Sequence, residues 1–173
     1  MGTWYFSNSA LKLGVDPLVV PEEAGFRVGP GAIEILRLET HYDNPNEDAG
    51  VLDNSGVILY YTPNLRTYDA GVLQLGDPGV QEIIDIESGV GLAEYEYSCP
   101  SECTSAWPWE IHVFSSFLHM HEVGSKIWTT HWRGDERLRI SNRIEYWDFN
   151  FQQQTPVSYT VQPGDRLNTH CVF

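Results

Sequence analysis

The hydrophobic and polar residues of this chain alternate with a period near two in several short runs. Residues 31–46, GAIEILRLETHYDNPN, carry apolar side chains at close to every second position and end in the turn-forming Asn-Pro-Asn. Successive side chains of a β-strand point to opposite faces, so this pattern predicts a strand followed by a turn. Residues 57–62 are rich in β-forming side chains and predict another strand.

The second half of the chain continues in the same way. Glutamate and tyrosine alternate over residues 94–97, which predicts a strand with one face in water. Residues 111–121, IHVFSSFLHMH, predict a longer strand, and Arg133-Gly-Asp-Glu136 predicts a hairpin turn between TTHW and RLRI. Because no amphipathic helix or repeat is present, the pattern favours an all-β fold.

Composition and charge narrow the class of protein. Of the 173 residues, 42% are hydrophobic and 13% aromatic, which suffices for a packed core and argues against wholesale disorder. The formal net charge of −14 repels nucleic acid and anionic membranes, so no such partner is expected, whereas a small cationic substrate such as an amine would be attracted. No signal peptide or membrane-spanning run is visible, so any secretory signal is expected upstream in a longer chain.

His119 and His121 offer the clearest candidate chemistry. On a strand, positions i and i+2 share a face roughly 7 Å apart, so two imidazoles at this spacing can meet on one metal ion. Imidazole nitrogen suits copper, zinc, iron and nickel. A His-x-His pair alone is more often an ordinary polar or packed pair than a metal site. A simple zinc-binding module built on this pair is the least favoured function.

The other histidines of the second half lack ligand-like spacing. His112 lies seven residues before His119, which puts it on the opposite face of a regular strand unless a bulge intervenes. His131 and His170 have no such spacing to the pair, so packing in the core or at the surface is expected for both.

Several motifs together carry a family resemblance. PEEAGFRVGPG, ILRLETHYDNPN, YYTPNLRTYDAGVLQLG, IHVFSSFLHMHEVGSKIW and PGDRLNTHCVF follow one another from about Pro21 to Phe173. In this order they resemble the copper type II, ascorbate-dependent monooxygenases, the family of dopamine beta-monooxygenase and peptidylglycine alpha-hydroxylating monooxygenase. The resemblance implies two antiparallel, jelly-roll-like β-sandwich domains that each carry one copper. One copper, held by three histidines, passes electrons from ascorbate. The other, held by two histidines and a methionine, binds dioxygen and hydroxylates a C–H bond.

The resemblance assigns three residues as copper ligands and divides the chain. His119 and His121 match the histidine pair of the oxygen-binding copper, and His41 matches the third histidine of the electron-transfer copper. Residues 1–76 correspond to the C-terminal part of the first domain and residues 77–173 to the N-terminal part of the second. The turn-forming Gly76-Asp-Pro-Gly79 lies at this boundary.

Departures from the family pattern predict an incomplete enzyme. The family's electron-transfer copper takes two further ligands from an adjacent His-His pair, and no such pair occurs in this sequence. The family's methionine ligand lies beyond PGDRLNTHCVF, and Met120, between the two histidines, points away from them on a strand. We therefore expect a partial chain that lacks flanking parts of the same enzyme and is inactive by itself.

Phe117 bears on the substrate. It stands where the peptidylglycine enzyme has an arginine that binds the substrate carboxylate, so the resemblance favours an enzyme like dopamine beta-monooxygenase over a peptide-amidating one. The alternative is a catalytically inactive, secreted β-sandwich used for binding or structure, because a site can be lost while the fold is kept.

The three cysteines fit no zinc site. Cys99, Cys103 and Cys171 leave an odd number, and their spacing is not that of a zinc ribbon. They match cysteines that pair with downstream residues in the family, so the resemblance implies disulfide bonds and a secreted or secretory-pathway location.

Overall fold

A computed structural model describes residues 18–38, 40, 42, 44–54, 56–77, 86, 89, 91–152 and 154–173. One compact unit spans Val20–Gly71, and the other contains Val72–Phe173. This division falls close to the predicted boundary, and the assignment of 1–76 and 77–173 to two copper domains stays a prediction. Among the described residues, no helix is long and apolar enough to cross a membrane.

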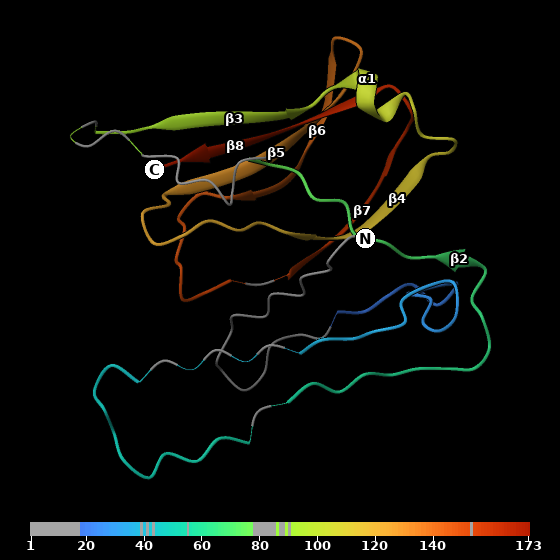
Figure 1. Cartoon of the computed structure of the whole chain (residues 1–173). Coiled ribbons are helices and arrows are strands. Elements are labelled where there is room, and N and C mark those ends of the chain that lie inside the picture. The colour runs from blue at the N-terminus through green and yellow to red at the C-terminus, as the bar shows by residue number, and fades with distance from the viewer. Residues whose placement is uncertain are drawn as a thin grey trace. The chain divides into compact units, whose positions relative to one another are not determined.

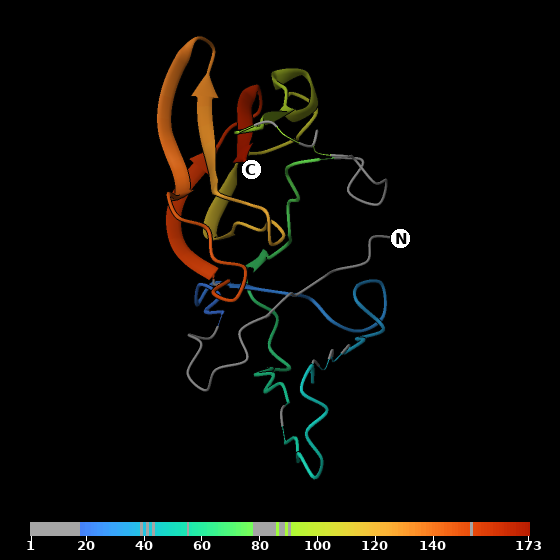
Figure 2. The ribbon, with the colours of Figure 1, turned by 90° about the vertical axis from the view of Figure 1, so that its left-hand side faces the viewer.

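Two antiparallel sheets build the second unit, which confirms the predicted all-β sandwich (Figure 1). The larger sheet has the order β3-β8-β5-β6 and consists of Glu94–Cys99, Asp165–Val172, Lys126–Arg133 and Glu136–Ile144. The smaller sheet pairs β4, Ile111–Phe117, with β7, Gln154–Val161. The predicted hairpin is the β5–β6 turn, orange in Figure 2, where Gly134 has a φ of +56°. A one-turn helix α1, Ser101–Thr104, which the pattern did not predict, follows β3.

The core lies on the face of the larger sheet that meets the smaller sheet. Leu167, Thr169 and Cys171 alternate along the central strand β8 and are at most 7% exposed. Across the sandwich, the ring of His131 on β5 lies 5.7 Å from the ring of Tyr159 on β7. The inner faces of β8 and β5 are thus closed against the second layer, as the strand period requires.

The outer face of the larger sheet is covered by its own side chains. The Trp128 ring stacks on His170 with 4.7 Å between centroids, and the Arg143 guanidinium lies 4.9 Å from the Trp128 centroid. Arg166 lies 5.1 Å from the centroid of Trp132 in the same manner. His170 therefore has a packing role, as expected from the sequence.

The strands predicted over residues 31–46 and 57–62 are absent from the described residues of those runs. Among its described residues, the Val20–Gly71 unit contains only the two-residue parallel pair β1, Ala24–Gly25, and β2, Tyr68–Asp69, and an isolated bridge from Val28 to Ile33. An extended run needs a partner strand for its backbone N–H and C=O groups, and within the described residues these two runs gain only the isolated bridge at Ile33. Its apolar side chains accordingly stay exposed, for example Ile35 at 85% and Ile58 at 80%.

Candidate metal site

His119 and His121 follow directly after β4 and do not lie within it. The strand ends at Phe117, whose partner Gln154 is the first residue of β7, so the ladder stops there. The predicted strand through residue 121 is therefore too long. Leu118 and Met120 are nevertheless buried, at 6% and 5% exposure, while the two histidines are exposed. The alternation of the strand thus persists for two residue pairs beyond its last hydrogen bond.

The two imidazole rings lie together on the exposed side of this segment. Their centroids are 5.2 Å apart and their planes are inclined by 78°. Met120 points the other way, into the cluster that contains Ile127 and Cys171. The structure therefore brings the two rings to one side, as the two-residue spacing predicts, and excludes Met120 from that side.

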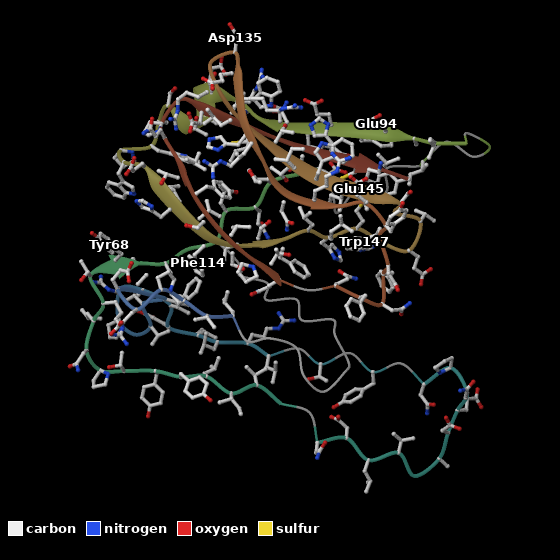
Figure 3. All side chains as sticks on the ribbon, turned by 180° about the vertical axis from the view of Figure 1, so that it is seen from behind. Tyr68, Glu94, Phe114, Asp135, Glu145 and Trp147 are labelled. Carbon is white, nitrogen blue, oxygen red and sulfur yellow. The ribbon has the colours of Figure 1, made fainter. Side chains whose placement is uncertain are left out.

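A loop after β6 surrounds the pair. Its residue Gln152 places Oε1 2.5 Å from Nδ1 of His119. The Trp147 ring meets His119 edge-on at 6.5 Å, and its Nε1 donates to the backbone oxygen of His121 at 3.1 Å. Phe149 lies edge-on to His121 at 6.3 Å. In Figure 3, Trp147 lies toward the end of the sandwich opposite the β5–β6 turn at Asp135.

Sequence patterns could not place these loop residues at the site. No spacing rule links the aromatic run from Tyr146 to Phe151 to histidines about 30 residues earlier. What links this loop to the pair is the register between β4 and β7, and that register is known only from the structure.

Gly124 allows the turn after the pair to pack tightly. Its N–H donates to the oxygen of His121 at 3.0 Å. A Cβ at this position would lie 2.8 Å from the Met120 Cε and 3.0 Å from the Trp147 Cδ1. Only a residue without a side chain fits at this position. Gly124 therefore lets the Trp147 ring pack against the backbone of His121.

Phe117 forms the remaining wall of the site. Its ring stacks on His119 with 6.1 Å between centroids and an interplanar angle of 14°. Phe117 is therefore an aromatic neighbour of the His119 imidazole.

The third predicted copper ligand, His41, lies outside the described residues. His112 is exposed on β4, where its Nδ1 lies 3.2 Å from the Thr160 hydroxyl. In the part of the chain that the structure describes, no three His, Cys, Asp or Glu side chains form a group suited to a metal ion. The described residues thus bring together two candidate ligands, both imidazoles.

His131 belongs to a buried ion-pair cluster, which confirms its expected role in packing. Its side chain is fully buried, and Nε2 lies 2.7 Å from Oδ2 of Asp165, which is 1% exposed. Burial by itself raises the pKa of Asp165, but hydrogen bonds from Arg133, from the Gln162 backbone N–H and from His131 outweigh it and hold that pKa well below its usual range. This cluster joins β5 to the start of β8.

None of the three cysteines, all of which the structure describes, forms a disulfide within the chain. Burial, helped by the nearby Asp77 carboxylate, raises the pKa of Cys171 to about 11. Burial and the neighbouring Cys103 likewise raise the pKa of Cys99. Both are therefore neutral thiols at physiological pH, and the predicted pairing with downstream residues stays a prediction.

Known proteins match nearly the whole length of this chain. The profile of the copper type II ascorbate-dependent monooxygenase C-terminal domain matches residues 68–173. Dopamine beta-hydroxylase from Bos taurus is 40% identical over 172 residues, and tyramine beta-hydroxylase from Caenorhabditis briggsae is 36% identical over 171 residues. Each alignment covers 95% of this chain but only 28% and 29%, respectively, of the relative. The chain thus spans less than a third of the length of these relatives.

Proposed function

This chain belongs to the copper type II, ascorbate-dependent monooxygenase family, and on that premise we propose that His119 and His121 bind the oxygen-binding copper of such an enzyme. The observation that carries the proposal is the juxtaposition of two exposed imidazole rings 5.2 Å apart on one side of their segment. Two imidazoles from one short segment suit copper and leave coordination positions open for other ligands.

The described residues fit a copper ion in chemistry as well as in position. Both rings are exposed, and Gln152 occupies Nδ1 of His119, so Nε2 remains for a metal. When bound, copper supplies the dioxygen and electron chemistry, with ascorbate as the proposed reductant. The aromatic neighbours Phe117, Trp147 and Phe149 shield the flanks of the rings and limit how far they can turn.

We propose that the rest of the metal machinery comes from other parts of a longer protein. These parts are the methionine ligand of this copper and the His-His pair that would join His41 on the electron-transfer copper. The chain spans only 28–29% of its relatives, which supports this assignment. The family resemblance and the three cysteines support a proposed location in the secretory pathway.

The proposed substrate is a small amine. Two relatives are named for the amines dopamine and tyramine. Trp147, whose ring lies edge-on to His119, also lines a surface hollow of about 410 Å³ with Tyr146, Phe151, Asp148 and Arg143, the last of which is paired with Glu145. Aromatic faces and a carboxylate suit an aromatic ring with an ammonium group. Phe117 in place of an arginine removes the bidentate anchor that a peptide carboxylate would need.

Incubating the 173-residue chain with copper, ascorbate, oxygen and a phenylethylamine is expected to give no hydroxylated product above that from free copper. The reason is that His119 and His121, the two candidate ligands among the described residues, are too few to complete both copper centres. A longer protein that includes this segment and the remaining ligands is expected to turn the amine over, and its His119→Ala variant is expected to lose that activity. Product formation by the 173-residue chain alone, measured by liquid chromatography, would contradict the assignment.

A further inference from the structure

We propose that Gln152 is a positioning residue that fixes His119 in the tautomer with its proton on Nδ1, so that Nε2 is presented to the metal. The role of Gln152 toward the metal rests on the proposed function. The hydrogen bond between Gln152 and His119, however, is present in the metal-free chain. Gln152 lies about 30 residues from the pair in sequence and is not a ligand itself.

The first step is that the Gln152 side chain is held in one orientation. It is 2% exposed, so it does not exchange partners with water. Its Nε2 donates to the backbone oxygen of Phe149 at 2.9 Å. A carbonyl oxygen accepts but does not donate, so the end of the amide that faces Phe149 has to be the nitrogen. The opposite end, facing His119, is then the oxygen.

The second step concerns the proton on His119. Oε1 of Gln152 lies 2.5 Å from Nδ1 of His119, and an amide oxygen can only accept. Nδ1 must therefore carry the hydrogen. A neutral imidazole has a single N–H, so Nε2 keeps a free lone pair, which is the form in which it binds a metal. Metal-bound histidines commonly donate their other N–H to an oxygen in this way.

The third step explains why the two residues meet. In the antiparallel pair of β4 and β7, Ser115 faces Pro156 and Phe117 faces Gln154. Continuing this register by two residues beyond the last pair puts His119 opposite Gln152. Their side chains then lie on the same face of the sheet as those of Phe117 and Gln154. The sheet therefore places the glutamine, and the bond from Nε2 to Phe149 fixes its rotation.

Gln154 provides a matched control. It is a glutamine two residues further along the chain, at the start of β7, and its Oε1 is buried without a hydrogen-bond partner among the described residues. Replacing Gln154 by leucine changes the same chemical group near the site but leaves the contact between His119 and Gln152 intact.

The test is a nitrogen-15 NMR measurement of the His119 ring in the metal-free chain at about pH 8, where an ordinary imidazole is neutral. We expect the Nδ1–H tautomer in the unaltered chain and in Gln154→Leu. In Gln152→Leu the signals should move toward the Nε2–H tautomer, while Gln152→Glu, which keeps an acceptor oxygen, should retain Nδ1–H. The unaltered chain gives an answer even if Gln152→Leu does not fold. A predominant Nε2–H tautomer of His119 in the unaltered chain would overturn the proposal.

A second readout uses copper. Loss of an outer hydrogen-bond partner of a metal-bound histidine lowers metal affinity about 10–100-fold, so Gln152→Leu should weaken Cu(I) binding by that factor and Gln154→Leu should not. Equal affinities in the two variants would contradict a role for Gln152 toward the metal. If His119→Ala leaves copper binding unchanged, the proposed function fails, whereas the tautomer in the metal-free chain still decides the positioning claim.

Discussion

Replacing His119 and His121 together by alanine is expected to weaken Cu(I) binding by more than about 100-fold, which exceeds the loss caused by removing one outer partner of a ligand. The two rings are the only exposed histidines that the described structure brings to one place, 5.2 Å apart. Without them this side of the segment offers no nitrogen ligand. Competition with a colourless Cu(I) chelator measures the change directly.

Two controls make this result specific. Thiolates bind Cu(I) strongly, so the comparison is made in a chain with Cys99→Ser and Cys103→Ser, while the core residue Cys171, 7% exposed, is kept. His112→Ala removes an exposed histidine from β4, the strand that precedes the pair, and should leave the affinity unchanged. Equal affinities of the double variant and the unaltered chain would exclude the pair as the copper site.

Asp165→Asn is expected to lower the free energy of unfolding by about 3 kcal/mol, a value typical of breaking a buried ion pair. The Asp165 carboxylate is 1% exposed and accepts from the Arg133 guanidinium at 2.8 Å and 2.9 Å and from the Gln162 N–H at 2.8 Å. Asparagine cannot accept all of these bonds, and Arg133 loses its counter-charge. Urea unfolding followed by tryptophan fluorescence provides the measurement.

The pH dependence of this contribution has a definite sign. The folded-state pKa of Asp165 is lowered, so its stabilising effect is present above the unfolded-state value of about 3.9 and is lost as the pH falls from there through the folded-state pKa. The asparagine variant should lack this acid-dependent loss. Asp135→Asn, at the exposed tip of the β5–β6 turn in Figure 3, should change stability by no more than about 0.5 kcal/mol. An equal loss in both variants would mean that the buried cluster contributes nothing specific.

The strands of the second unit were predictable because their side chains alternate between two different environments. Residues 94–97, the β5–β6 turn and the start of the 111–121 run were predicted correctly in type and place. The end of the last run was not, because alternation continues for four residues after the ladder with β7 stops at Phe117. A pattern reports which side a residue faces, but it does not report whether the backbone has a partner.

The Val20–Gly71 unit shows the same distinction more strongly. Its residues 31–46 have the alternation of a strand, but the described residues there pair with no neighbouring strand. Exposed side chains such as Ile35 and Leu52, at 85% and 95%, indicate a segment that gains no burial from the described residues around it. The alternation indicates a tendency to form a strand, but a strand forms only where a partner strand is present.

The candidate site could be predicted only in part. The residue types and spacing of His119 and His121 are visible in sequence, and the direction of Met120 follows from the same alternation. Gln152 and Trp147 could not be found, because their contacts depend on the β4–β7 register and on a loop that begins after β6. The residues that orient a ligand are therefore harder to read from sequence than the ligand itself.

The central claim is that His119 and His121 bind copper through their imidazoles, and X-ray absorption of the Cu(I)-loaded chain carrying Cys99→Ser and Cys103→Ser tests it most directly. We predict a spectrum with the scattering pattern of two imidazoles for each copper, and its disappearance when both histidines are replaced by alanine. A copper shell made of sulfur, or a spectrum that the double substitution leaves unchanged, would contradict the account.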